Sequence, residues 1–218
     1  AACSGFIYGV ELARTIALQD DRPVLVVGAE AMSRMLDWDD YKTCVLFGDG
    51  AGAVVVKSEE VADDSPRRGI YRSILGADGS GSQFLRREGG CRRPFNPETD
   101  ARFITLHMEG KPVFNFAVRT MNSVIGRFMD EEKIEPEDIA WVVPHQANKR
   151  IIDAAVKRLS IPEDKFYLNL DRCANTSGAS IPIALGEMDE KGLLKPGDLI
   201  ITVGFGAGLS YGGNIIYW

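Results

Sequence analysis

Histidine and closely spaced cysteine are scarce in this chain of 218 residues. There are two histidines, His107 and His145, and four cysteines that form no CxxC pair. A zinc site draws three or four ligands from such residues, usually at short spacing. The sequence therefore predicts no metal centre, and its cysteines are expected to be reduced, as in a cytoplasmic protein.

Long apolar runs and excess positive charge are lacking as well. No apolar stretch approaches the roughly 20 residues that cross a bilayer, and no basic segment followed by an apolar one opens the chain. The 25 Lys and Arg residues are outnumbered by 31 Asp and Glu, which gives a net charge of −6. Because nucleic-acid binding needs excess cations, we expect no nucleic-acid partner, no membrane span and a cytoplasmic location.

What is present is an alternation of apolar strands and amphipathic helices. Continuous apolar runs at 23–28 and 51–56 predict strands covered on both faces. The arginine- and glycine-rich stretch 77–101 is predicted to be a long surface loop. Helices are predicted at about 6–17, 113–129, 148–159 and 180–191, and further strands at 69–76, 139–143, 166–169, 198–203 and 209–217. The pattern indicates a layered α/β protein with a mixed sheet.

Cys3 stands immediately before the first predicted helix. A thiol at a helix N-terminus faces unpaired backbone N–H groups and the positive end of the helix dipole, and both stabilise the thiolate. The alternative is a small buried apolar residue, the commoner state of a free cysteine. Position alone favours that alternative, and Ser4-Gly5 shifts the balance slightly towards reactivity because glycine lets a substrate approach closely.

His145 ends an apolar strand, and Gln146, Ala147 and Asn148 after it open a helix. Its imidazole is thus placed at the carboxyl end of a strand, where α/β proteins commonly build their sites. A structural histidine explains the position equally well. His107 lies in an alternating polar and apolar segment and is interpreted as structural.

Asn175 lies in the segment CANTSGAS, a loop of small polar residues that runs into a helix. Its side-chain amide could donate a hydrogen bond to an oxyanion formed in a reaction. Alternatively, it is a turn residue or shares an N-cap role with Ser177.

Two glycine-rich segments do not fit a phosphate loop. Residues 48–52 lead into a strand, not into the helix N-terminus that cradles a phosphate, so no bound nucleotide or other cofactor is predicted. Residues 204–208 join two strands, and their expected role is to present a backbone N–H to a carbonyl oxygen. Lys149 and Arg150 follow His145 closely. Most such charges are simply solvated, but in an acidic protein basic residues beside a candidate site can dock an acidic partner.

Four segments in this order, AACSGF, VVPHQANKRI, ANTSGAS and GFGAG, resemble the β-ketoacyl-acyl carrier protein synthase III family of thiolase-fold condensing enzymes. LFGDGAGAVVV and MEGKPVFNFAVR match as well, so the resemblance covers nearly the whole chain. One such segment is weak, whereas the ordered set is highly specific. The resemblance implies a thiolase-like layered α-β-α fold with mixed sheets, with 1–65 as the end of the N-terminal half and 66–218 as the C-terminal half.

The resemblance also implies an acyltransferase that initiates fatty-acid synthesis. Cys3 would take an acyl group from an acyl-CoA as a thioester, which splits one difficult reaction into two easier steps. His145 and Asn175 would hydrogen-bond the thioester carbonyl of malonyl-acyl carrier protein and stabilise the enolate left when carbon dioxide departs. That carbanion would attack the acyl-Cys3 carbonyl to give a 3-oxoacyl-acyl carrier protein.

Further site residues follow from the same matching. The resemblance implies an oxyanion hole made by the backbone N–H groups of Cys3 and Ala207. It also implies contacts with pantetheine at Asn148 and Phe114.

Partners follow as well: acyl-CoA, acyl carrier protein docked at Arg150 with Lys149, and a second copy in a homodimer. Two departures from the family matter. The family's chain starts well before its nucleophile, so we expect this chain to be the C-terminal portion beginning at the nucleophile Cys3, with a missing N-terminal segment or companion chain. Tyr41 stands where the family often has an arginine that faces the CoA nucleotide, which weakens the expected contact there.

Two other functions stay open. A type III polyketide synthase uses the same three residue types but takes malonyl-CoA and extends repeatedly; the HQANKR segment and Arg150 favour the carrier-protein enzyme. A non-catalytic fragment or subunit with a binding role is favoured by the absent N-terminal part and disfavoured by the intact set of three residues. The sequence does not determine the chain length of the starter or the pathway.

Overall fold

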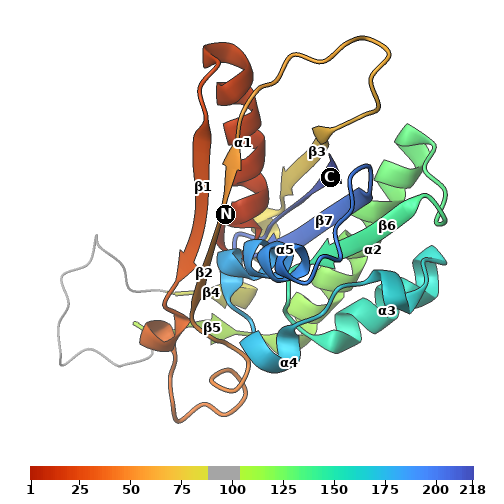
Figure 1. Ribbon diagram of the computed structural model, residues 1–218. Helices are drawn as coiled ribbons and strands as arrows, with labels where there is room; N and C mark the ends of the chain where they lie inside the picture. Colours follow the sequence, from red (N-terminus) through yellow and green to blue (C-terminus); the bar gives the residue numbers. More distant parts are fainter. Residues whose placement is uncertain (88–103) are drawn as a thin grey trace.

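A four-stranded mixed sheet forms the centre of the protein (Figure 1). Its order is β3 (Gly69–Ala77), β8 (Ser210–Tyr217), β7 (Leu199–Gly206) and β6 (Ile139–Pro144). β3 pairs antiparallel with β8 and β8 with β7, whereas β7 and β6 run parallel. The predicted α/β class and mixed sheet are confirmed.

Helices cover both faces of this sheet. On one face lie α2 (Gly110–Glu132) and α3 (Lys149–Leu159), and on the other α1 (Gly5–Asp20) and α5 (Ser180–Glu190). Consecutive strand residues point to opposite faces, so Ile201 packs with the first pair of helices and Ile200 with the second. β7 is therefore buried along its whole length, as expected of a strand covered on both faces.

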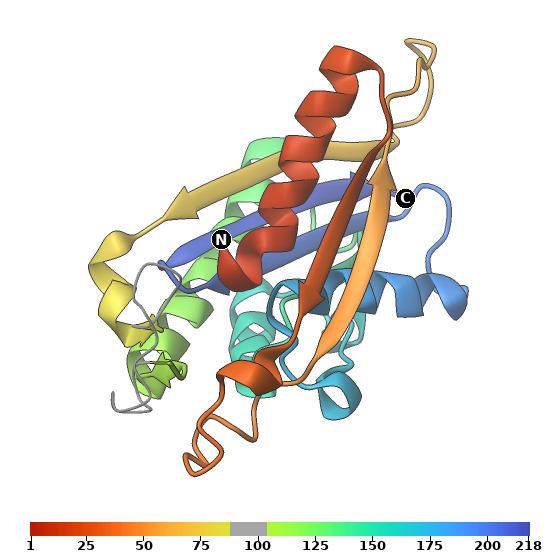
Figure 2. The same cartoon turned by 90° about the vertical axis from the view of Figure 1, so that its left-hand side faces the viewer.

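The spacing of Phe6, Val10, Ala13 and Ala17 predicts α1, and all four side chains are buried. Such positions lie on one face of a helix. Figure 2 shows α1 lying between the β1–β2 pair and the sheet that contains β7 and β8. The short 3-10 helix η1 (Ala2–Ser4) leads directly into α1 and contacts β7 and β8.

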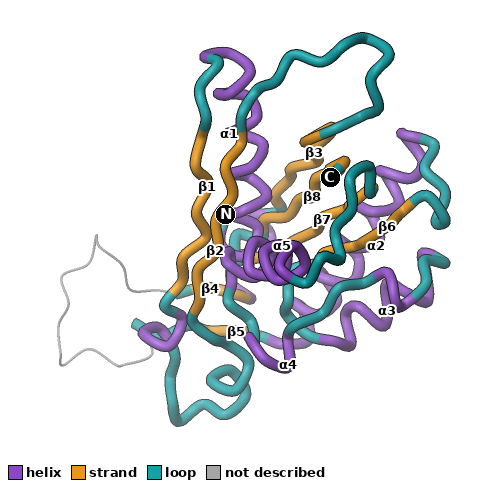
Figure 3. Tube along the Cα trace, viewed as in Figure 1, coloured by secondary structure: helices purple, strands orange, loops and turns teal. Residues whose placement is uncertain are grey.

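β1 (Val24–Glu30) and β2 (Gly50–Val56) form a separate antiparallel pair. Their connection, residues 31–49, contains the 3-10 helix η2 (Met32–Met35) and extends on the side where β4 and β5 lie (Figure 3). β2 follows the glycine-rich segment directly, which confirms that this segment leads into a strand.

The expectation that β1 and β2 are covered on both faces is wrong within the described residues. Leu25, Val27 and Val55 are 63%, 56% and 65% exposed. α1 and α5 pack against one face of the pair, and no element of the described residues packs against these three side chains. An apolar run alone cannot distinguish a strand covered on both faces from one with an apolar but open face.

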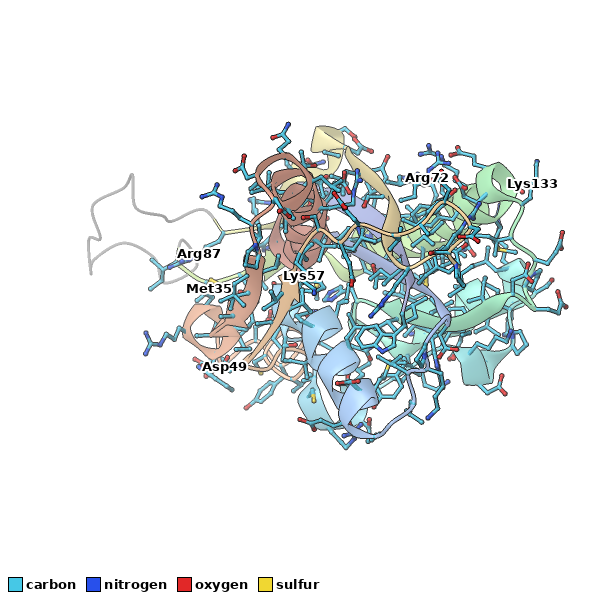
Figure 4. All side chains as sticks on the ribbon, turned by 45° about the horizontal axis from the view of Figure 1, so that its top comes forward. Met35, Asp49, Lys57, Arg72, Arg87 and Lys133 are labelled. Carbon is cyan, nitrogen blue, oxygen red and sulfur yellow. The ribbon has the colours of Figure 1, made fainter. Side chains whose placement is uncertain are left out.

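The computed structural model describes residues 1–87 and 104–218, so the second part of the predicted loop 77–101 lies outside the described residues. The first part is not an irregular loop but contains regular structure. The 3-10 helix η3 (Gly79–Phe84) leads into β4 (Leu85–Arg86), which pairs with β5 (His107–Met108). Figure 4 shows Arg87 and Met35 at the same end of the molecule.

The predicted strand at 166–169 is wrong. An isolated bridge joins Phe166 to Val142, and the Tyr167 N–H donates to the Val142 carbonyl at 3.0 Å. The 3-10 helix η5 (Glu163–Lys165) precedes this segment, and Asn169 begins the turn into α4 (Leu170–Cys173). The extended segment between them is too short for a strand.

Ion pairs join the edge strand to the helix layer. Arg72 on β3 pairs with Glu131 and Glu132 near the end of α2. Figure 4 shows Arg72 and Lys133, the residue that ends α2, at the same end of the molecule. The remaining predicted helices and strands are confirmed within a few residues of their bounds. Within the described residues, no helix combines the length and the apolar character that crossing a membrane requires.

Candidate active site

A cavity of about 410 Å³ brings together the three residues that the sequence analysis singled out. Cys3, His145 and Asn175 all line it, although they come from three separate parts of the chain. Cys3 lies in η1, His145 directly follows β6, and Asn175 follows α4. The cavity is therefore the candidate site.

Cys3 is held in a buried turn, with 8% of its surface exposed. Its thiol donates a hydrogen bond to the hydroxyl oxygen of Ser177, at 3.4 Å. Burial raises the pKa of the thiol to about 11; the Ser177 contact lowers this pKa, and the charge of Glu30 raises it. Desolvation is the largest of these causes, so burial of Cys3 agrees with the buried alternative of the sequence analysis, and the reactivity of its thiol stays a prediction.

Gly206 on β7 explains how closely the Cys3 turn approaches the sheet. A Cβ atom at position 206 would lie 2.7 Å from the Cys3 backbone nitrogen and 3.1 Å from its Cβ. No side chain fits there, so the glycine of the GFGAG segment lets the turn that carries Cys3 pack on the strand. Gly206 also lines the cavity.

His145 is fixed by its backbone and by its ring. Its N–H donates to the Val203 carbonyl at 2.7 Å, which extends the pairing of β6 with β7 by one residue. The ring nitrogen Nδ1 lies 2.7 Å from the Ser180 hydroxyl oxygen, and the ring meets that of Phe205 edge-on at 5.5 Å. Burial lowers the pKa of His145 to about 3, so the imidazole is neutral near pH 7.

Asn175 is fixed on both sides as well. Its N–H donates to the Leu46 carbonyl and its carbonyl accepts from the Gly48 N–H, at 2.9 and 3.0 Å. The side-chain oxygen Oδ1 accepts from the Ser177 N–H at 2.9 Å, which makes the local turn that the alternative interpretation expected. Because an N–H can bind only the oxygen, this contact assigns the amide, and Nδ2 has no hydrogen-bond partner among the described residues.

The segment 175–180 connects the three site residues. Ser177 contacts the Cys3 thiol, Asn175 lies in the same turn, and Ser180 contacts His145. The Gly178 N–H in turn donates to the Glu30 carboxylate at 3.0 Å. The sequence analysis did not single out Ser180; the only signal of its contact with His145 was a hydroxyl five residues after Asn175 in a segment of small residues.

Other predicted site residues divide into two groups. Phe114, Asn148 and Arg150 line the cavity. Lys149 does not, since its ammonium group pairs with Asp153 and Glu163 at 2.6 and 3.1 Å.

Ala207, the other half of the predicted oxyanion hole, lies in the turn between β7 and β8, and it is not among the residues that line the cavity. Asn148 has a structural role in addition, because its Oδ1 accepts from the Arg150 N–H at 2.9 Å as the N-cap of α3.

Two cations that the sequence analysis did not assign to the site, Lys42 and Lys111, also line the cavity. Lys42 directly follows Tyr41, which is 77% exposed. Together with Arg150 they give the cavity three positive side chains, so an anionic ligand is favoured there. Within the parts of the chain that the structure describes, no group of three or more His, Cys, Asp or Glu side chains could hold a metal ion.

His107 lies outside the set that lines the cavity. It pairs with Arg86 across β4 and β5, and its Nε2 lies 3.9 Å from a Glu109 carboxylate oxygen. Its side chain is half exposed, which agrees with its interpretation as structural.

Two segments of the chain match one protein family. Residues 1–79 match the family described as 3-oxoacyl-[acyl-carrier-protein (ACP)] synthase III, and residues 129–218 match the description 3-oxoacyl-[acyl-carrier-protein (ACP)] synthase III C terminal. Together they include Cys3, His145 and Asn175.

Individual relatives agree with this match. The chain is 49% identical over 219 residues to the beta-ketoacyl-[acyl-carrier-protein] synthase III of Caldanaerobacter subterraneus, with 99% of this chain and 65% of the relative covered. A solved structure of the synthase III of Thermus thermophilus superposes with a TM-score of 0.88 at 42% identity, over 100% of this chain and 66% of the other. A third, a 3-oxoacyl-(acyl-carrier-protein) synthase III, gives a TM-score of 0.90 at 31% identity, over 100% of this chain and 67% of the other.

These superpositions confirm the thiolase-like α/β fold. The chain spans 65% of the length of the first relative and 66% of that of the first solved structure.

Proposed function

Because the chain belongs to the 3-oxoacyl-[acyl-carrier-protein] synthase III family, we propose that it performs a decarboxylative condensation of an acyl-CoA with malonyl-acyl carrier protein. The product would be a 3-oxoacyl-acyl carrier protein, formed through an acyl-Cys3 intermediate. The single observation that carries this proposal is the meeting of Cys3, His145 and Asn175 in one cavity.

In the first step, the Cys3 sulfur attacks the thioester carbonyl of the acyl-CoA. The bond from that carbonyl to the CoA sulfur breaks, and CoA leaves as a thiol that carries the proton Cys3 has lost. Burial keeps Cys3 protonated in the free chain, so the proton has to leave when the substrate is bound. The proposed oxyanion hole, the backbone N–H groups of Cys3 and Ala207, would stabilise the tetrahedral intermediate.

In the second step, the bond between malonyl carbon and carboxylate breaks, carbon dioxide leaves, and the electron pair forms an enolate. His145 and Asn175 would each donate one hydrogen bond to the enolate oxygen. Asn175 has a free donor for this, since Oδ1 accepts from the Ser177 N–H while Nδ2 has no partner among the described residues. The enolate carbon then attacks the acyl-Cys3 carbonyl, and the Cys3 sulfur leaves and regains a proton.

Neutral donors suit this step. A protonated, cationic imidazole is excluded near pH 7, because burial lowers the pKa of His145 to about 3. Preorganised donors in a site shielded from water need no reorganisation during the reaction, and one such donor is worth about 3 kcal/mol.

The residues that line the cavity favour a thioester of phosphopantetheine as the ligand. Phe114 and Asn148 would contact the pantetheine chain, which is partly apolar and partly amide. Lys42, Lys111 and Arg150 would attract its phosphate, whether it belongs to CoA or to the carrier protein.

Docking of the acidic carrier protein is proposed at Arg150. Its guanidinium group lies over the Phe114 ring, 5.8 Å from the centroid. Lys149 is a weaker candidate than the sequence suggested, because Asp153 and Glu163 already neutralise its charge. Several expectations stay predictions. They are a cytoplasmic location, a homodimer, the absence of a cofactor, the division of the two thiolase-like halves between residues 65 and 66, and completion by an N-terminal segment or companion chain.

A type III polyketide synthase-like activity on malonyl-CoA is the alternative, and a binding role without catalysis is another. A direct comparison of malonyl-acyl carrier protein with malonyl-CoA tests the proposal against both. We expect acetyl-CoA and malonyl-acyl carrier protein to give 3-oxobutyryl-acyl carrier protein, detected by mass spectrometry. Exclusive use of malonyl-CoA would favour the polyketide activity, and no product from either would favour the binding role.

A further inference from the structure

The hydroxyl group of Ser180 lies next to Nδ1 of the His145 ring, and Ser180 is buried, with 2% of the residue exposed. Its oxygen lies 2.7 Å from His145 Nδ1, 2.9 Å from the Ser177 carbonyl oxygen and 3.5 Å from the Gln146 nitrogen. The first two neighbours are possible acceptors, and the third is a donor.

A hydroxyl group has one proton, so Ser180 can donate to only one of the two acceptors. If it donates to the Ser177 carbonyl, His145 must carry its proton on Nδ1 and donate to Ser180, which leaves Nε2 as an acceptor. If it donates to His145 Nδ1, the proton of the neutral imidazole is on Nε2. The direction of this one hydrogen bond therefore fixes the tautomer.

The surroundings favour donation to His145. The Ser177 carbonyl already accepts the backbone N–H of Ser180 at the start of α5, so it keeps a partner when the hydroxyl turns away. The Gln146 backbone N–H donates to the same hydroxyl oxygen, with 3.5 Å between nitrogen and oxygen. His145 Nδ1 has no other hydrogen-bond partner among the described residues.

We propose that Ser180 is a positioning residue that donates to Nδ1 of His145 and thereby keeps the proton on Nε2. Nε2 is then the ring nitrogen that can donate to a ligand in the cavity. The consequence for catalysis rests on the proposed function, because only an enolate or another oxyanion requires a donor at that nitrogen.

The tautomer itself can be measured without any activity. The chain has only two histidines, and His107 is half exposed and outside the cavity, so the ¹⁵N signals of His145 are readily distinguished. In ¹⁵N-histidine-labelled protein near pH 7, we expect the His145 proton on Nε2. A proton on Nδ1 would overturn the inference, whatever the activity of the protein.

Three variants test the role of the hydroxyl. Ser180→Ala should give a mixture of the two His145 tautomers, and Ser180→Thr, which keeps a hydroxyl, should restore the Nε2 form. Ser73→Ala is the matched control: it removes a partly buried hydroxyl that bonds Glu11 and Asn214, away from the cavity, and should leave the His145 signals unchanged. A pure Nε2 form in Ser180→Ala would also overturn the inference.

The two half-reactions separate this inference from the proposed function. Ser180→Ala should lower the decarboxylation rate by about 10-fold or more, since one donor is misdirected and loss of a whole donor costs about 100- to 1000-fold. Acylation of Cys3 by acyl-CoA should stay within about 2-fold of the parent, because the enolate donors act only in the second step. Equal loss of both half-reactions would indicate a general structural effect and contradict the positioning role. Failure of the parent protein in both would contradict the proposed function and leave the tautomer measurement valid.

Discussion

The Cys3 sulfur lies 3.4 Å from the hydroxyl oxygen of Ser177, although 174 positions separate the two residues in the chain. The turn that carries Ser177 also fixes Asn175 and leads to Ser180, which contacts His145. One short segment therefore contacts or contains all three residues of the candidate site, Cys3, Asn175 and His145. The proposed function uses this arrangement: Cys3 carries the acyl group, while His145 and Asn175 donate hydrogen bonds to the enolate.

Glu30 offers a test of what controls the thiol. Its charge contributes to the raised pKa of Cys3, although burial is the larger cause. Glu30→Gln removes that charge and keeps an oxygen that can accept the Gly178 N–H. We expect the pH profile of Cys3 alkylation by iodoacetamide to shift to lower pH while remaining above that of a free cysteine. An unchanged profile would contradict this electrostatic role, and Glu163→Gln, at an exposed site, is the control.

Asn175→Ala separates the two chemical steps. The variant loses the Nδ2 donor and should lower malonyl decarboxylation by about 100- to 1000-fold, the range for one oxyanion donor. Acylation of Cys3 by acyl-CoA should change much less, since the Cys3 thiol bonds the Ser177 hydroxyl and the Asn175 side chain bonds the Ser177 backbone N–H. Rates of carbon dioxide release and of acyl-enzyme formation measure the two steps, and a selective loss of acylation would refute the assignment.

Gly206→Ala tests the fit between β7 and the turn that carries Cys3. The added methyl group would lie 2.7 Å from the Cys3 backbone nitrogen, so the turn must move and Cys3 acylation should fall at least about 10-fold. The matched change Gly126→Ala places a methyl group on α2 with no atom within 4 Å, and should stabilise that helix by up to about 1 kcal/mol. Acylation kinetics and thermal unfolding, measured on both variants, distinguish a displaced Cys3 turn from a change in overall stability. Full activity of Gly206→Ala would show that the close contact is not needed.

His145 should make the protein sensitive to acid. Burial lowers its pKa to about 3, so between pH 6.5 and about 3 the unfolded chain takes up a proton that the folded chain does not. The free energy of unfolding therefore falls as the pH is lowered through this window, by at most roughly 5 kcal/mol from this group. His145→Gln should flatten the pH dependence measured by denaturant unfolding, whereas His107→Gln should not. Parallel slopes in the parent and His145→Gln would be contrary to this assignment.

Local patterns predicted much of the fold. The four apolar residues of α1 at helical spacing are all buried, and β7 and β8 occur where two apolar runs flank a glycine-rich turn. The strand expected at 166–169 failed because only one bridge to Val142 forms before the chain turns into α4. Strand propensity depends on the segment alone and could not reveal that it forms only this one bridge to β6.

The sequence predicted that Cys3, His145 and Asn175 belong to one site, and all three line one cavity. The electrostatics of the site were less predictable. The raised pKa of Cys3 was not predictable, since it depends on burial by parts of the chain distant in sequence. Likewise, the charge of Lys149 is neutralised by Glu163, a partner 14 residues away on another element.

The central claim is that Cys3 carries the acyl group and passes it to the carbanion formed beside His145 and Asn175. Peptide mass spectrometry after exposure to acyl-CoAs, from acetyl to medium chain, followed by addition of malonyl-acyl carrier protein, tests it most directly. The account predicts an acyl group on Cys3 that disappears as 3-oxoacyl-acyl carrier protein forms, and no acylation in Cys3→Ala. An unmodified Cys3, or an acyl group on Cys44 or Cys173 that the carrier protein discharges, would contradict it.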